Sequence, residues 1–148
     1  MASRAEDEVM VEVVGVFEHH LVLDNREQRV PLLMVRDGAD RELHLPIGSC
    51  EGLAVHLALE QQLVPRPLTH DLALRLLERL SAQLERVVIG GHSEGAAQAT
   101  IHLHTAKSEL AVSARPGDAV ALALRAEAPI YATEGLLAGI EQAGSDMT

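Results

Sequence analysis

The chain has 148 residues, enough for one compact domain with a sizeable core. Its residues are 47% hydrophobic and 23% charged. The formal net charge of −10 argues against nucleic-acid binding driven by a broad basic surface. Cys50 is the only cysteine, so an intramolecular disulfide is excluded, and no apolar run approaches the roughly 18 residues of a membrane span. We expect a cytoplasmic protein without a membrane segment, whose domain covers residues 9–140 between flexible ends at 1–8 and 141–148.

The first third of the chain reads as three strands followed by a helix. Apolar and β-branched runs predict strands over residues 10–17 with 19–23, 30–35 and 41–47. Asp37-Gly38 is a hairpin signal between the second and third strands. Ser49 is expected to cap a helix of about residues 51–63, which Pro65 and Pro67 would end.

A central helix is predicted next, because leucines recur at helical spacing from Thr69, its expected cap, to Leu84. Strands over residues 86–89, 98–104 and 109–113 should follow, with a turn at 90–95. Pro116 is well placed at the first position of a helix that runs to about Ala126. A short strand at 130–133 and a short helix at 134–140 would complete the chain.

The same order of elements occurs before and after the central helix. A shift of 67 positions aligns Leu43 with Leu110 and Ala54 with Ala121, and it places Glu51 on Asp118, both at helix starts. We therefore predict an α+β domain with an internal duplication of a strand-hairpin-strand-helix unit around the central helix, in two small mixed sheets or one shared sheet.

Two charged turns stand out, because each precedes an apolar helix. The first is Pro65-Arg66-Pro67-Leu68-Thr69-His70-Asp71-Leu72, and the second is Ala114-Arg115-Pro116-Gly117-Asp118-Ala119. Unpaired N–H groups at a helix start favour anions. Each turn places both positive and negative side chains at such a helix start. These turns are the best candidates for chemistry.

The first turn also carries a family resemblance. Two further stretches share this resemblance: Ile47-Gly48-Ser49-Cys50-Glu51-Gly52 before the first turn and Arg115-Pro116-Gly117-Asp118-Ala119 after it. In their order along the chain, the three stretches resemble the bifunctional nuclease (DNase-RNase) domain family over roughly residues 11–137. The family usually has Ser where this chain has Gly117. The resemblance implies an α+β domain, often a homodimer, with nuclease activity on both DNA and RNA.

We assign roles to six residues from the chemistry that phosphodiester hydrolysis requires. Glu51, Asp71 and Asp118 are candidate catalytic carboxylates and candidate ligands for Mg²⁺ or Mn²⁺, which would activate water. His70 would move a proton, and Arg66 and Arg115 would bind phosphate oxygens.

Three other interpretations remain open. The acidic residues can serve only to stabilise helix starts, with Arg66 pairing with Asp71 and Arg115 with Asp118. The chain would then be a non-catalytic, homo-oligomeric protein-interaction module, which the acidic charge and the scarcity of aromatic residues favour. A binder of small anions at the two arginine-bearing helix starts is the third interpretation. Convergence of Arg66, His70, Glu51 and Asp118 in one concave site would favour an enzyme.

Overall fold

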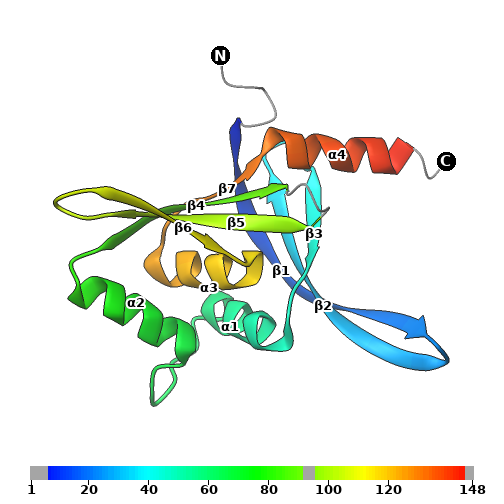
Figure 1. The fold of residues 1–148 in the computed structure, drawn as a ribbon. Helices are drawn as coiled ribbons and strands as arrows, with labels where there is room; N and C mark the ends of the chain where they lie inside the picture. The colour runs from blue at the N-terminus through cyan, green and yellow to red at the C-terminus, as the bar shows by residue number, and fades with distance from the viewer. Residues whose placement is uncertain (1–6, 92–95, 146–148) are drawn as a thin grey trace.

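The computed structural model describes residues 7–91 and 96–145, which form seven strands and four helices (Figure 1). The strands are β1 (Glu8–Leu23), β2 (Arg26–Asp37), β3 (Glu42–Pro46), β4 (Gln83–Gly91), β5 (Ala97–His104), β6 (Glu109–Ala114) and β7 (Ile130–Thr133). The helices are α1 (Ser49–Leu59), α2 (Thr69–Arg79), α3 (Pro116–Ala126) and α4 (Glu134–Ser145). This is the mixed α and β composition expected from the sequence. None of the helices described is long and apolar enough to cross a membrane.

All seven strands belong to one sheet, in the order β3-β2-β1-β7-β4-β5-β6. Every neighbouring pair is antiparallel except β4 and β7, which are parallel. The short strand β7 joins the two halves, because Ile130 lies opposite Val11 of β1 and Val87 of β4. Of the two arrangements left open by the sequence, the shared sheet is therefore the correct one.

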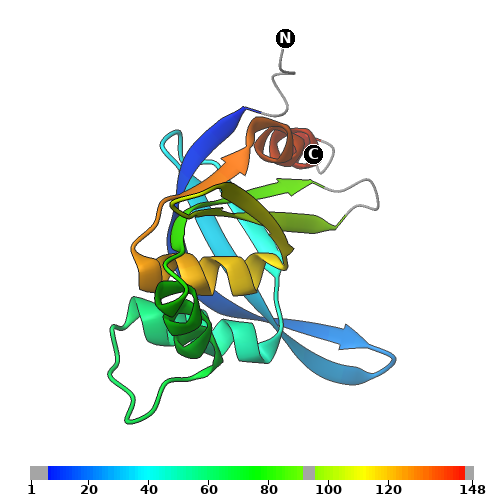
Figure 2. The ribbon, with the colours of Figure 1, turned by 60° about the vertical axis from the view of Figure 1, so that its left-hand side comes forward.

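Helices α1, α2 and α3 cover one side of the sheet, whereas α4 lies at its end, beside β7 and the start of β1 (Figures 1 and 2). α3 packs against both α1 and α2 and against β4 and β5, so it forms the centre of the helical layer. Val55 of α1 and Val120 of α3 are fully buried with Leu33 and Ile89 of the sheet. The core is aliphatic, as the near absence of aromatic residues requires.

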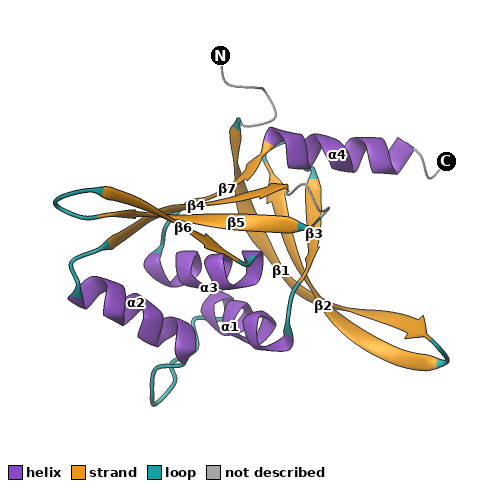
Figure 3. Ribbon diagram, in the orientation of Figure 1, coloured by secondary structure: helices purple, strands orange, loops and turns teal. Residues whose placement is uncertain are grey.

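The sheet extends beyond the helices as a two-stranded arm (Figure 3). Residues 17–29, at the outer ends of β1 and β2, are all exposed. The turn at its tip places Asp24 and Asn25 at φ values of 52° and 60°, a left-handed conformation that short polar side chains tolerate in tight hairpins. Its two strands are held together by the antiparallel pairing of β1 with β2.

Two of the predicted helices end earlier than expected. α1 stops at Leu59 instead of residue 63, and α2 stops at Arg79 instead of Leu84. The leucine spacing misled the second prediction: Ser81 takes a φ of 61°, which ends the helix, and Leu84 is a buried strand residue of β4. The predicted turn at 90–95 is wrong at its first two residues, since β4 continues through Gly91, and residues 92–95 lie outside the described part.

The expected helix caps were wrong as well. The N-cap of α1 is Gly48, not Ser49, and the N-cap of α2 is Leu68, not Thr69. The Thr69 hydroxyl is not needed at the start of α2, because the Asp71 carboxylate accepts a hydrogen bond from the Leu68 backbone N–H at 2.9 Å. At the other end of the chain, α4 continues to Ser145, five residues past the expected domain end, and residues 146–148 are outside the described part.

The repeated element order is visible in the sheet, where β1-β2-β3 and β4-β5-β6 flank β7. The 67-residue shift carries the bounds of α1 onto those of α3. Descent from a duplicated unit remains a prediction from this agreement. Its consequence for the site is concrete: α1 and α3 lie side by side, and their first turns carry equivalent acidic residues, Glu51 and Asp118.

Candidate functional site

The site lies where the first turns of α1, α2 and α3 meet. α1 contributes Glu51 and α3 contributes Asp118, each the third residue of its helix. α2 contributes His70, its second residue. Residues that are far apart in sequence thus meet because α3 packs against both of the other helices.

Glu51 is buried between two glycines. Its side chain is only 7% exposed, and it lies over Gly48 and against Gly117. A Cβ atom added at Gly117 would come within 2.7 Å of the Glu51 Cβ, closer than packed carbon atoms approach. A side chain at Gly48 would collide with the Glu51 carboxylate. The two glycines therefore allow the helix starts to approach and the carboxylate to fold back over its own N-terminus.

Arg115 joins the two carboxylates. Its Nη2 atom lies 3.0 Å from Glu51 Oε1 and 2.9 Å from Asp118 Oδ2, and its Nε donates to the same Asp118 oxygen at 3.0 Å. The Arg115 side chain is nevertheless 75% exposed. Its remaining amino group, Nη1, makes no hydrogen bond to the described residues, so the guanidinium still has donors for an anion from solvent.

His70 completes the cluster through a hydrogen bond of 2.8 Å between its Nε2 and Asp118 Oδ1. An ionised carboxylate can only accept, so the hydrogen in this bond belongs to Nε2. Nδ1 is then the ring nitrogen that can take up or release a proton. No hydrogen bond from Nδ1 to another described residue is formed.

The charges around Asp118 keep it ionised. Burial by itself would raise the pKa of this carboxyl, but the hydrogen bonds from His70 and Arg115 and their charges outweigh burial and hold the pKa below its ordinary value. The pKa of Arg115 is raised, chiefly by its hydrogen bond to Asp118 and also by the charges of Asp118 and Glu51. The centre of the site is thus a cation held by two carboxylates.

This cluster borders a cavity of about 740 Å³. Glu51, His70, Arg115 and Asp118 all line it, together with Cys50, Thr69 and an apolar wall of Leu53, Ala54, Pro67, Leu68, Ala73 and Leu122. A few charged groups on a mostly apolar wall are typical of a ligand site, and the volume is large enough for a nucleotide.

Two of the six predicted residues are directed elsewhere. The Asp71 carboxylate accepts a hydrogen bond from Arg125 Nε at 2.7 Å and does not line the cavity of His70. Arg66 is exposed and makes no ion pair or hydrogen bond within the described part of the chain. The structure therefore brings together Glu51, His70, Arg115 and Asp118. Of the two ion pairs considered in the alternative interpretation, Arg115 with Asp118 forms and Arg66 with Asp71 does not.

The partner of Asp71 was missed at the sequence level. Arg125 also donates to the Ala121 carbonyl at 2.9 Å, so it ties the start of α2 to the last turn of α3. The pKa of Asp71 is lowered because the Arg125 hydrogen bond, the Leu68 N–H and nearby positive charge outweigh the opposing effect of burial. Only the packing between α2 and α3 reveals the role of Arg125.

The carboxylates of the site have the right chemistry for a divalent cation, but their present contacts leave no place for one. Carboxylate oxygens are good ligands for Mg²⁺ or Mn²⁺, yet those of Glu51 and Asp118 already hold Arg115, and Asp71 holds Arg125. Among residues 7–91 and 96–145 no three His, Cys, Asp or Glu side chains are grouped as a metal site. A metal would thus need to replace the Arg115 guanidinium.

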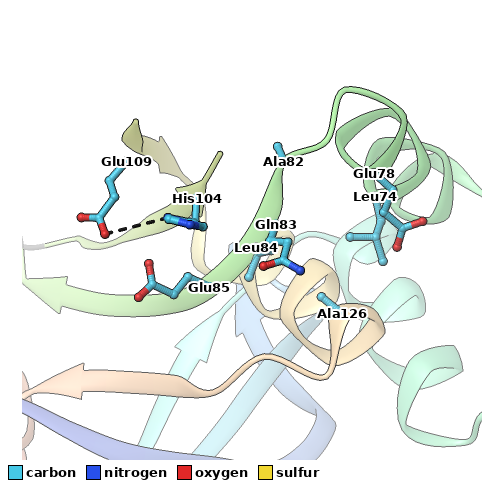
Figure 4. A pocket seen from close by; sticks show the side chains of 9 residues that line it. All are labelled: Leu74, Glu78, Ala82, Gln83, Leu84, Glu85, His104, Glu109 and Ala126. Atoms are coloured by element: carbon cyan, nitrogen blue, oxygen red, sulfur yellow. Dashed lines mark ion pairs between the residues drawn. The ribbon is translucent and has the colours of Figure 1, made fainter. Parts of the chain in front are cut away.

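A second cavity, of about 570 Å³, lies between α2, β4, β5 and β6 (Figure 4). Its charged lining consists of Glu78, Glu85 and Glu109 with His104, whose Nδ1 is 4.0 Å from Glu109 Oε1. No arginine or lysine lines it. A phosphate would meet mainly negative charge there, so the cavity at Arg115 is the better candidate for a nucleic-acid strand.

Comparison with known proteins identifies the family of the chain. A family model described as the bifunctional nuclease domain matches residues 32–144, which include all six predicted residues. Two uncharacterised proteins, from two strains of Mycobacterium tuberculosis, are each 44% identical to the chain over 114 residues. The matched segment covers 75% of this chain and 66% of each relative, so the chain spans slightly less than two thirds of their length.

Proposed function

The chain belongs to the bifunctional nuclease domain family, and from this premise we propose that it is a nuclease that hydrolyses phosphodiesters of DNA and RNA with little sequence preference. The observation that supports the proposal is the convergence of Glu51, His70, Arg115 and Asp118 on one cavity from three helix starts. If the acidic residues served only to stabilise their own helix starts, they would not need to line a shared cavity. Family membership alone would leave the position of the site open.

Each of the four residues has a role in this proposal. Arg115 binds the anionic phosphate oxygens through its exposed guanidinium and stabilises the charge that develops on them. His70 moves a proton at Nδ1. Asp118 holds the imidazole through Nε2 and balances its positive charge, and Glu51 fixes Arg115 from the opposite helix. Asp118 and Glu51 are then positioning residues.

We also propose that the site can bind a divalent metal ion. Glu51 and Asp118 would hold Mg²⁺ or Mn²⁺ once Arg115 had moved towards the phosphate, which its exposure permits. When bound, such an ion would supply charge neutralisation and a more acidic water. Asp71 would not be a ligand unless it left Arg125.

The test is cleavage of end-labelled single- and double-stranded DNA and RNA in Mg²⁺, Mn²⁺ or EDTA. We expect cutting by the wild-type protein and a loss of about 100-fold or more for His70→Gln, because proton transfer by a positioned side chain contributes on the order of 10²–10⁴ in rate. Arg115→Gln should lose activity too. His19→Gln, an exposed histidine on the arm, is the matched control and should cut normally.

The alternative function, a homo-oligomeric interaction module, is supported by an exposed apolar stripe on α2 and the residues that flank it at both ends. Leu68, Leu72, Leu76 and Leu80 are spaced by four residues and are all exposed, and α2 has no fully buried residue. Leucines at this spacing form one face of a helix, which a second copy of the chain could cover.

Sedimentation or light scattering tests this alternative. We expect the wild-type protein to form a homodimer or larger homo-oligomer and Leu72→Gln/Leu76→Gln to be monomeric with unchanged helix content. Leu63→Gln is the control, since Leu63 is 99% exposed and lies outside α2. A monomeric wild-type protein would contradict the oligomer. Cleavage that persists in the monomeric variant would show that association and catalysis are separate.

A further inference from the structure

We propose that this site cuts RNA without any metal ion, by promoting attack of the RNA's own 2′-hydroxyl on the neighbouring phosphorus. The inference rests on the proposed nuclease function and narrows it to one substrate class and one chemistry. DNA, which lacks the 2′-hydroxyl, would then be cut only by a route that brings in an activated water.

The first argument is the resident cation. Arg115 lies between Glu51 and Asp118, at 3.0 Å and 2.9 Å, and so occupies the position where these carboxylates would hold a divalent ion. A guanidinium neutralises a phosphate and stabilises its charge in the transition state, but it does not make water nucleophilic. A site built around Arg115 therefore favours a substrate that carries its own nucleophile.

The second argument is the orientation of His70. Because Nε2 donates to Asp118, Nδ1 is the basic nitrogen of the neutral ring. The Asp118 carboxylate then stabilises the imidazolium that forms when Nδ1 accepts a proton. This is the pairing that a general base requires, and both His70 and Arg115 line the same cavity.

The third argument is the cavity wall. Leu53, Leu68 and Leu122 give one side an apolar surface beside the charged cluster. Such a surface suits the flat face of an unpaired base or the carbon side of a ribose, and the side chains offer no pattern of donors and acceptors that would select one base. Single-stranded RNA of any sequence is the substrate that this wall accepts most readily.

The reaction balances without a further reactant. His70 Nδ1 takes the proton of the 2′-hydroxyl, the O2′–P bond forms, and the P–O5′ bond breaks. The leaving 5′-oxygen takes a proton from water at the open side of the cavity, and the imidazolium later returns its proton to solvent. The products are a 2′,3′-cyclic phosphate and a 5′-hydroxyl. No atom of Glu51, Arg115 or Asp118 changes its bonds.

The experiment compares three oligonucleotides of one sequence in excess EDTA: RNA, DNA, and RNA with a single 2′-deoxy nucleotide. We expect wild-type protein to cut RNA, to leave DNA intact and to skip the bond after the deoxy position. Mass spectrometry should find a 2′,3′-cyclic phosphate end. His70→Gln and Asp118→Asn, prepared identically, should each lose about 100-fold or more, whereas His19→Gln should not.

Each other outcome has a distinct meaning. RNA cutting that requires a metal, or that leaves no cyclic phosphate, would overturn this inference and leave the nuclease proposal standing. Equal RNA cutting by wild type and by both site variants, with normal circular dichroism, would assign the activity to a contaminant and overturn the inference. No cutting of any nucleic acid with or without metal would overturn both.

Discussion

At the scale of single residues, the site depends on two positions that have no side chain. Gly117 lets the first turn of α3 approach Glu51. The close contact means that even one added carbon must displace either Glu51 or a helix start. From the sequence, Gly117 was only a difference from the family that the chain resembles. The sequence could not show that the absent side chain leaves room for Glu51.

We expect Gly117→Ala to lower the free energy of unfolding by about 1–3 kcal/mol, because overpacking at the Glu51 Cβ outweighs the better helix propensity of Ala. Urea unfolding measures the change. Gly139→Ala is the control, because a Cβ there meets nothing within 4 Å and Gly139 lies within α4. That variant should be as stable as wild type or up to about 1 kcal/mol more stable. Equal behaviour of the two variants would contradict the contact.

Asp71 gives a second prediction at this scale. Its pKa is lowered in the folded state, so the unfolded chain binds more protons as the pH falls towards the ordinary value of about 4. The stability that Asp71 contributes is therefore present above that value and is lost as the pH falls through the folded pKa. Asp71→Asn should destabilise by roughly 1–3 kcal/mol at pH 7 and much less near pH 3.

Urea unfolding of both proteins between pH 3 and pH 7 measures this difference. A difference that does not shrink at low pH would show that the Asp71–Arg125 ion pair is not its source. If Asp71→Asn instead keeps wild-type stability at pH 7 but loses nuclease activity, the catalytic role predicted from the sequence would be correct and the structural role wrong.

At the scale of elements, Arg41 links the start of α4 to the turn after β2, in addition to the packing of α4 against β3, β4 and β7. Arg41, in the turn after β2, donates to both Glu134 oxygens at 2.8 Å and 2.9 Å and to Asp37 at 2.8 Å. Asp37 is buried, and its pKa is lowered because the Arg41 hydrogen bonds and charge and the Ala39 N–H outweigh burial. The β2–β3 turn and the start of α4 are thus held by a single charged network.

Arg41→Ala should lower the free energy of unfolding by about 3 kcal/mol, because it leaves a buried carboxylate without its cation. Hydrogen exchange should become faster throughout α4 while α3 remains protected. Arg29→Ala is the control: Arg29 pairs with Glu18 at 3.8 Å on the exposed arm and should change stability by less than about 1 kcal/mol. Equal effects of both variants would contradict the role of Arg41.

The elements also show what the sequence could and could not predict. Every strand and helix was expected, because alternation and helical spacing report which faces are buried. The end of α2 was not, since Leu80 and Leu84 continue the helical spacing although one is exposed and the other belongs to β4. Likewise, four of the six predicted residues converge, but Asp71 was separated from them by Arg125, a partner 54 residues away. Such pairings depend on how helices pack.

At the scale of the whole molecule, the charge of −10 limits how a nucleic acid can bind. Arg115 is the only arginine or lysine that lines the cavity of the site, and Arg66 directly precedes the lining residue Pro67. Affinity for single strands should fall with salt at a slope of only about −0.7 per phosphate contact. Attraction over long distances should be weak.

With one or two phosphate contacts, the KM for single-stranded RNA should rise by less than about tenfold between 50 mM and 200 mM salt. Steady-state cleavage at four or five salt concentrations measures this dependence. Arg115→Lys, which keeps the charge, should keep the salt slope but lose rate because a lysine cannot bridge both carboxylates and a phosphate. A steep salt dependence would indicate a larger basic surface than this site provides.

The position of β7 has a consequence for how the protein is made. Residues 130–133 are the only strand between β1 and β4, yet they are synthesised after all six other strands. On the ribosome, the two three-stranded meanders can each form from local contacts, but their edge strands β1 and β4 cannot become part of one sheet until β7 emerges. The joining step brings residues more than 100 positions apart into register, since Val11 pairs with Ile130. Completion of the sheet, and with it the docking of α4, should therefore be the late and slow event in biogenesis, and a chain released before residue 130 would expose the unpaired edges of β1 and β4 to aggregation.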